Sequence, residues 1–354
     1  MDGMVKMRFA LNSEQQQMSA IARDYFSRIQ EGYTEANTAF DRVLWADMNA
    51  ALGIQGLSVP EQLGGSGAST VTLATVFEAA GMTLYAGPLL SSVGWATSLL
   101  VAVGPKSPRL LEQLVSGECV AAVVADSSVR IEAGIVSGSA KFVVDAAADF
   151  LLIITSDGGM AYVPSAAEGV SIEYMENLDA TRPISRVLFD GASSINLAGD
   201  ASDEVAHATA RAQALLAAEA SGGAAACVAG VIEHAKSRRQ FGTSIGSFQA
   251  VQHRIAEMHL DVEQAWTAAM FAAWCADEDT EGLRWAAPLA LATATTAYKH
   301  CARSAIQLYG GMGFTWEHDA HRHFRRATVV SHQFGNHRTL HERILSVAVD
   351  QESW

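Results

Sequence analysis

Cysteine is scarce in this 354-residue chain, which contains only four. They lie far apart without a Cys-x-x-Cys pair, and no secretory signal peptide is recognisable, so neither a disulfide framework nor a zinc finger is expected. A reduced, cytoplasmic setting with thiols buried as apolar side chains fits best. The four are Cys119, Cys227, Cys275 and Cys301.

Positive charge is also scarce, with 24 Lys and Arg against 38 Asp and Glu, a net charge of −14. This balance argues against a broad nucleic-acid surface, so an anionic ligand would need a local pocket built from a few arginines. No apolar run approaches the roughly 18 uninterrupted residues of a membrane span. The positive mean hydropathy, +0.14, comes from small Ala and Gly residues.

The composition, 49% hydrophobic and 18% charged, supplies a sizeable core, and the length suggests two or three folding units. Residues 1–118 have helical patterns, beginning with a cap and a Ser-x-x-Gln box at 12–16. Residues 119–200 hold short β-rich runs separated by Gly, Asp, Ser and Pro, the spacing of a small β-barrel or sandwich. Residues 201–354 return to the helical period.

The third block predicts several long helices. Residues 203–238 contain no proline, and the segment from Phe248 to Ala265 places apolar residues at steps of three and four. A third helix is expected over 283–309 and a fourth beginning near Glu317. Leu340, Ile344 and Val347 mark a fifth. Narrow apolar seams on long helices are typical of an antiparallel bundle. The fold class is therefore mainly α with a β-domain, without internal repeats.

Two segments between the bundle helices carry candidate chemistry. The first, SRRQFGTSIGSFQ at 237–249, sets paired arginines beside an exposed aromatic ring, which suits a phosphate next to a flat ring. Its structural alternative is a solvated helix end with arginine near the C-terminal dipole. The second, QLYGGMGFTWEHD at 307–319, follows a helix rather than a strand, so the Rossmann interpretation fails. Its glycines either end that helix or let a ligand approach the backbone.

Together these strings resemble the flavin-binding signature of the acyl-CoA dehydrogenase family, RxQFG…IxxFQ followed by QxxGGxGF. Residues 56–67, GLSVPEQLGGSG, are similar to its N-terminal motif, and KFVVDAAADFLLI at 141–153 to its β-domain. The resemblance implies an N-terminal helical domain at 1–118, a middle β-barrel at 119–200 and a C-terminal four-helix bundle at 201–354. FAD and an acyl-CoA thioester are expected between them.

The resemblance also implies which residues hold the pyrophosphate and adenosine end of FAD. In the family these groups reach the flavin of a neighbouring subunit, so an oligomer is expected. The matching cofactor-binding residues are Arg238, Gln240, Phe241, Gln307, Gly310 and Gly311.

The family's catalytic carboxylate is missing at both of its known positions. Phe334 stands where one branch has glutamate, and Ala212 stands where a second branch has it. Glu219, two turns beyond Ala212, is a weak candidate for a displaced base, and a polar helix residue is its plainer interpretation. The β-domain departs too, since the flavin-contacting Trp-x-Thr string is replaced by a run ending at Asp145.

These departures predict a short subunit resembling those of hetero-oligomeric steroid-CoA dehydrogenases, whose longer homologous partner supplies the base. The assembled enzyme would introduce a 2,3 double bond into an acyl-CoA and pass electrons to an electron-transfer flavoprotein. Two alternatives stay open: a self-sufficient homotetramer with a displaced base, and a catalytically silent structural subunit. A histidine-rich run at 318–341 is interpreted as packing and capping rather than as a metal site.

Overall fold

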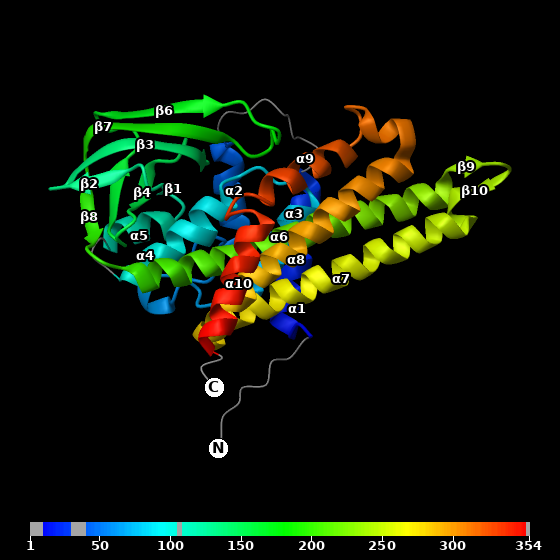
Figure 1. Cartoon of the computed structure of the whole chain (residues 1–354), viewed down its shortest axis with the longest axis horizontal. Helices are drawn as coiled ribbons and strands as arrows, with labels where there is room; N and C mark the ends of the chain where they lie inside the picture. The colour runs from blue at the N-terminus through cyan, green and yellow to red at the C-terminus, as the bar shows by residue number, and fades with distance from the viewer. Residues whose placement is uncertain (1–9, 30–39, 105–107, 352–354) are drawn as a thin grey trace, which may run out of the picture. The chain divides into compact units, whose positions relative to one another are not determined.

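A computed structural model describes residues 10–29, 40–104 and 108–351 (Figure 1). The chain divides into two compact units that interleave along the sequence. Unit 1 comprises residues 1–33, 70–85 and 213–354, and unit 2 comprises 34–69 and 86–212. Fold and composition agree with the expected class, a mainly helical protein with a β-domain. The predicted three-part boundaries stay a prediction.

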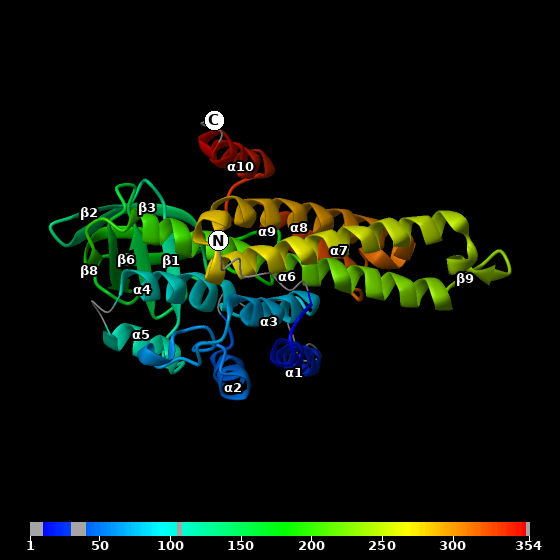
Figure 2. The same cartoon turned by 90° about the horizontal axis from the view of Figure 1, so that it is seen from below.

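Unit 1 is a helical assembly whose longest members lie side by side and run antiparallel (Figures 1 and 2). Helix α10 packs against α8, as does α9, while α1 and α7 both contact α3. Its helices are α1 (Ser13–Ile29), α3 (Thr70–Met82), most of α6 (Ser202–Ser237), α7 (Gln249–Glu278), α8 (Thr280–Tyr309), α9 (Ala320–Val330) and α10 (His337–Gln351).

Glycines allow α3 and α6 to cross at backbone contact. A Cβ atom on Gly81 would collide with the carbonyl oxygen of Glu219, and one on Gly222 would collide with that of Glu78. The two contacts are reciprocal. Glu78 and Gly81 lie one turn apart on α3, and Glu219 and Gly222 lie one turn apart on α6, so each glycine faces the glutamate of the other helix. Such close approach explains why this part of the bundle is built from small residues.

Asp277 of α7 fixes the start of α3. Its carboxylate accepts the Thr70 backbone N–H at 2.6 Å and the Thr70 hydroxyl at 2.5 Å. The N-terminus of a helix leaves its first N–H groups unbonded within the helix. A carboxylate from another helix therefore satisfies one of these groups and also complements the helix dipole.

Unit 2 contains two four-stranded sheets. The first has the order β1-β4-β5-β8, with β1 and β4 parallel and the other pairs antiparallel; the second is antiparallel with the order β2-β3-β7-β6. The strands are β1 (Ala121–Ala125), β2 (Arg130–Glu132), β3 (Ile135–Val144), β4 (Phe150–Ile154), β5 (Met160–Pro164), β6 (Val170–Met175), β7 (Ile184–Ser193) and β8 (Ile195–Ala198).

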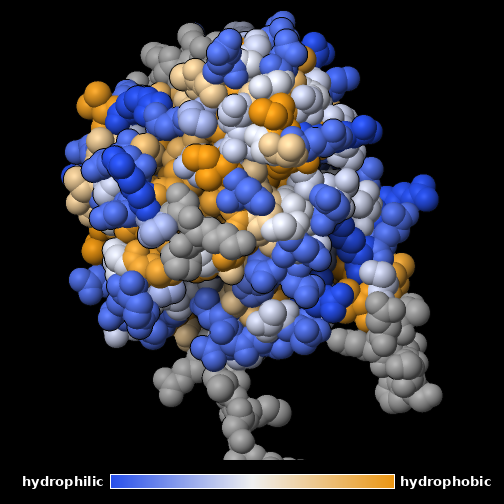
Figure 3. Space-filling model, turned by 90° about the vertical axis from the view of Figure 1, so that its left-hand side faces the viewer, coloured by the Kyte–Doolittle hydropathy of each residue, from blue (hydrophilic) through white to orange (hydrophobic). Residues whose placement is uncertain are grey.

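Short helices of unit 2 pack on the first sheet. An apolar core joins residues of η3, α4 and α5 to β1, β4 and β5. The outer surface on this side of the molecule shows hydrophobic groups scattered among polar ones (Figure 3). The helical elements of unit 2 are α2 (Arg42–Leu52), η2 (Glu61–Leu63), η3 (Leu89–Ala96, a π-helix), α4 (Thr97–Val103) and α5 (Pro108–Val115).

Helix α6 is long and apolar enough to satisfy a membrane-span test by length and composition. Its most apolar 18-residue window has a mean hydropathy of 1.7, and 72% of that window is buried inside the structure. The buried core helix of a helical bundle has the same composition.

Candidate functional site

Two helix junctions lie at the same end of unit 1. The His234 ring, near the end of α6, lies 4.8 Å from the Tyr309 ring at the end of α8, measured between centroids. Tyr309 in turn lies 4.0 Å from His318. A Cβ atom at position 230 would collide with the Tyr309 hydroxyl, so Gly230 permits this contact. The arginine–aromatic segment and the glycine segment, about 70 residues apart in sequence, therefore follow helix ends that touch.

The first junction is a tight hairpin formed by β9 (Arg239–Gln240) and β10 (Thr243–Ser244). At its tip Phe241 has a φ of 53° and is 94% exposed, a strained backbone that presents an apolar ring to solvent. Arg238 and Gln240 are exposed too. Phe248 meets Phe241 edge to face, with centroids 6.2 Å apart. The Arg238 side chain and the Phe241 ring are thus both exposed at this junction and accessible to a ligand.

The second junction exposes bare backbone. Gly310 has a φ of 64°, and a Cβ atom built on either Gly310 or Gly311 would meet no atom within 4 Å. Both residues begin the short 3-10 helix η5 (Gly310–Phe314). The backbone of two adjacent glycines is thus open to solvent, and a ligand can approach it closely where a side chain would stand in the way. The residues present therefore fit a flavin dinucleotide.

Burial lowers the pKa of two histidines of this region. Desolvation lowers the pKa of His234, with Arg238 and His318 adding to the effect, and desolvation also lowers the pKa of His318. Burial raises the pKa of Tyr309 to about 12. The arginines at the junctions keep their positive charge at any working pH.

Large apolar side chains are exposed around the two junctions. The apolar seam of α7 is buried at Met258 but remains partly exposed at its start, near Phe248. The Arg325 guanidinium lies 4.5 Å from the centre of the Trp316 ring. The exposed apolar side chains at the second junction, with their exposed fractions, are Met312 (43%), Phe314 (74%) and Trp316 (59%). A concentration of exposed aromatic rings marks a surface that binds something.

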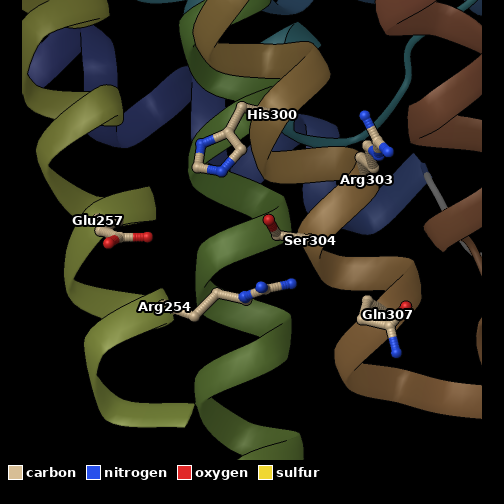
Figure 4. A pocket seen from close by; sticks show the side chains of 6 residues that line it. All are labelled: Arg254, Glu257, His300, Arg303, Ser304 and Gln307. Atoms are coloured by element: carbon tan, nitrogen blue, oxygen red, sulfur yellow. The ribbon is translucent and has the colours of Figure 1, made fainter. Parts of the chain in front are cut away.

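Gln307 lines a pocket of about 320 Å³ between α7 and α8 (Figure 4). The side chain of Arg254, on α7, extends toward α8, where Ser304 and Gln307 lie. Sequence reasoning identified Gln307 but missed the rest of the lining. The only sequence pattern that points to these residues is the repeat of polar side chains at steps of three and four on each helix. Such a repeat ordinarily indicates a helix face exposed to solvent. The other residues of the lining are Arg254, Glu257, His300, Arg303 and Ser304.

The two family positions for the catalytic base are closed and apolar. Ala212 is fully buried, and Phe334 is 8% exposed. Glu219 is buried, and its carboxylate accepts a hydrogen bond from the Arg326 guanidinium at 2.8 Å. Arg326, 2% exposed, also donates to the Tyr85 carbonyl oxygen at 3.2 Å. Glu219 is thus one half of a buried ion pair that joins α6 to α9.

In unit 2, Asp145 is turned inward. It is 4% exposed, and its carboxylate accepts the Ser91 hydroxyl at 2.6 Å. Its neighbour Phe142, three residues earlier, has a φ of 61° and is 68% exposed, next to a register shift between β3 and β7. Asp145, which the sequence predicts to lie near the flavin, is thus bonded to η3 within unit 2, while the Phe142 ring is exposed.

The histidine-rich run is used in packing and capping. The His318 ring accepts the Ala320 backbone N–H at 3.0 Å at the start of α9, and the Tyr298 hydroxyl lies 2.7 Å from His323. His321 packs edge to face on Trp316. Among the residues that the structure describes, no group of three or more His, Cys, Asp or Glu side chains is arranged to hold a metal ion.

Family comparison defines the class of protein to which this fold and these motifs correspond. Residues 12–118 match the acyl-CoA dehydrogenase N-terminal domain, and residues 205–348 match the acyl-CoA dehydrogenase C-terminal domain. The chain belongs to the acyl-CoA dehydrogenase family, whose cofactor is FAD. The resemblance carried by the two bundle motifs is thereby confirmed.

The relatives include two proteins of Mycobacterium tuberculosis. Acyl-CoA dehydrogenase FadE34 is 35% identical over 301 residues, covering 84% of this chain and 40% of the longer FadE34. Acyl-CoA dehydrogenase IpdE2 is 32% identical over 294 residues, covering 82% of each chain. This chain therefore spans less than half of FadE34 but most of IpdE2.

Solved structures share the fold. A chain of the ChsE4-ChsE5 complex from Mycobacterium tuberculosis superposes with a TM-score of 0.88 at 24% identity, covering 97% of this chain and 99% of that one. A chain of the Tcur3481-Tcur3483 steroid ACAD gives 0.85 at 24% identity, covering 96% and 99%. Both structures are described as pairs of differently named subunits.

Proposed function

We propose that this chain is one subunit of a hetero-oligomeric acyl-CoA dehydrogenase, and that a longer homologous partner supplies the catalytic glutamate. The reaction of the assembly is FAD-dependent α,β-dehydrogenation of an acyl-CoA thioester. One contrast carries the proposal. The groups for a flavin's nucleotide end are displayed together at touching helix ends, whereas both positions for the base hold apolar side chains.

The chain's own residues have binding roles in this proposal. Arg238 binds phosphate through charge-assisted hydrogen bonds, and Phe241 offers its ring to the adenosine end. Gln307 donates its amide, and the open backbone at Gly310 and Gly311 admits the ligand closely. FAD, when bound, accepts the hydride from the β-carbon of the acyl group. The α-proton must leave to a carboxylate, which a phenyl ring at position 334 cannot replace.

Two features favour a partner over a lone chain. Phe241, Phe314 and Trp316 are more than half exposed, a large cost in water unless a ligand or another subunit covers them. Glu219 is bound to Arg326 inside unit 1 and has a structural use. This observation disfavours the self-sufficient enzyme in which Glu219 is a displaced base.

The substrate and partners follow by analogy. The solved structures of similar fold include one named as a steroid ACAD, so we propose a bulky, steroid-like acyl group. Electrons would leave to an electron-transfer flavoprotein, and the setting would be cytoplasmic. Neither a nucleic acid nor a membrane is required by this function.

Co-expression tests the proposal. The chain is purified alone and with a longer family member that carries glutamate at a base position, and FAD content and acyl-CoA dehydrogenation are measured. We expect activity only in the mixed assembly, and we expect a Glu→Gln change in the partner to abolish it. A lone chain that is yellow and fully active would refute the paired arrangement. A mixed assembly that keeps its activity after that change would show that the base lies in this chain.

A further inference from the structure

The lining of the pocket between α7 and α8 contains more positive than negative side chains. Arg254 and Arg303 line it together with one carboxylate, that of Glu257, so the guanidinium groups outnumber the acid. The chain as a whole has a net charge of −14, which makes a locally positive lining unusual. His300 is the remaining charged or titratable member, and its ring bonds the Asp261 carboxylate at 2.5 Å.

Neither arginine is engaged elsewhere. Across the described residues no ion pair or side-chain hydrogen bond involves Arg254 or Arg303, although most other arginines of unit 1 are paired with a carboxylate. Both are exposed, while Ser304 at the pocket wall is 4% exposed. Two guanidinium groups, a hydroxyl and the Gln307 amide thus line one hollow of about 320 Å³. Arg254 extends from α7 toward α8, whereas the Arg303 side chain points away from Arg254 (Figure 4).

We propose that this pocket is a binding site for a phosphate group of a nucleotide, with Arg254 and Arg303 as its ligands. The inference rests on the proposed function, because Gln307 links the pocket to the flavin motif. In the assembly, the phosphate belongs to the dinucleotide of a neighbouring subunit's flavin. Guanidinium groups bind phosphate oxygens in pairs, and the Ser304 hydroxyl and Gln307 amide add neutral donors. Neither arginine lies in the recognised motif, so the pocket extends the binding surface along both helices.

Because the pocket contains both arginines and the Glu257 carboxylate, substitutions can either weaken or strengthen anion binding. Replacing either arginine with glutamine removes a charge-assisted hydrogen bond, for which we expect binding about 10- to 100-fold weaker. Glu257→Gln removes a repulsive charge, so anion binding should tighten. Arg343→Gln is the matched control, because Arg343 is exposed on α10, outside the pocket, and loses the same charge.

The first arm of the test uses the full chain and two probes, ADP and inorganic pyrophosphate, titrated by calorimetry with adenosine as the uncharged comparison. We expect both probes to bind the wild type and R343Q alike, to bind R254Q and R303Q more weakly, and to bind E257Q more tightly. Binding should weaken as salt is raised. Equal affinity in wild type, R254Q and R303Q would overturn the inference.

The second arm distinguishes the source of the phosphate and separates this inference from the proposed function. FAD retention is measured in the co-expressed assembly for R238Q, R343Q and the double variant R254Q/R303Q. Loss of FAD in the double variant, with R343Q unaffected, supports a flavin phosphate. Retention in the double variant but loss in R238Q overturns the flavin assignment and leaves the proposed function standing. If no assembly holds FAD, the proposed function fails, and weaker pyrophosphate binding by R254Q and R303Q then supports a site for a free nucleotide.

Discussion

The buried ion pair between Glu219 and Arg326 offers a sharp test of whether Glu219 has a structural or a catalytic use. The two side chains are 7% and 2% exposed, and their nearest N and O atoms are 2.8 Å apart. Removing one partner of such a pair leaves an uncompensated charge in the interior, which costs about 3–5 kcal/mol. We therefore expect Glu219→Leu to lower the free energy of unfolding by about 3–5 kcal/mol.

A double-mutant cycle supplies the magnitude of the coupling. In Glu219→Leu/Arg326→Met no buried charge remains, so most of the stability should return. The recovery stays incomplete because the Tyr85 carbonyl oxygen loses the donor that Arg326 provides, a cost of about 1–3 kcal/mol. Urea unfolding at one fixed protein concentration, followed by tryptophan fluorescence, measures each corner of the cycle.

The matched control is an exposed pair on the same helix. Glu233 and Lys236 are 2.7 Å apart but 74% and 69% exposed, so Glu233→Gln should change the free energy of unfolding by less than about 1 kcal/mol. A Glu219→Leu effect no larger than this control would refute the structural assignment. A double variant that is as stable as expected yet catalytically dead in the assembly would instead identify Glu219 as part of the reaction.

Three further outcomes follow from the contacts. Asp277→Ala should destabilise unit 1 by about 1 kcal/mol through the lost cap of α3, and Asp277→Asn less, as thermal unfolding would show; an unaffected alanine variant would contradict the cap. Burial raises the pKa of Cys301 to about 12, so a thiol reagent at pH 8 should modify the partly exposed Cys119 and leave Cys301 intact until denaturant is added. Burial raises the pKa of Glu78 above its ordinary value of 4.5, so the folded state binds this proton more tightly than the unfolded state, and stability falls as pH rises through that window. Glu78→Gln should flatten this part of the pH–stability curve, and an unchanged slope would contradict the assignment.

Local patterns predicted the helices well. The apolar repeat over 248–265 and the Ala-rich segment over 283–309 correspond to α7 and α8, because a seam at helical spacing must pack against another helix. The capping box of α1 lies one residue earlier than the predicted Ser-x-x-Gln box. Asn12 and Gln15 exchange the two hydrogen bonds of a capping box at 2.9 Å, rather than Ser13 and Gln16. One sequence offers two equally good registers there.

Long-range partners were beyond local patterns. Glu219 and Arg326 are 107 residues apart, and nothing near either residue indicates that α6 and α9 bring them together. The arginines beside Gln307 lie on two different helices, α7 and α8. The apolar seam predicts that these helices pack together, but it does not predict which of their polar residues lie next to one another. The sequence predicts Asp145 to be an acidic group near the flavin. In the structure it is buried, and its carboxylate accepts a hydrogen bond from the Ser91 hydroxyl of η3. Contacts of this kind depend on tertiary packing, which the hydrophobic period and the composition of the sequence do not predict.

The account depends most on the claim that the arginine–aromatic hairpin holds a neighbouring subunit's FAD. Its most direct test is the FAD content of the mixed assembly when this chain carries Arg238→Gln and the partner is unchanged. We expect the assembly to form with its normal subunit ratio and to lose FAD, because the altered side chain belongs to this chain and the flavin to the partner. Full FAD content in that assembly would contradict the claim.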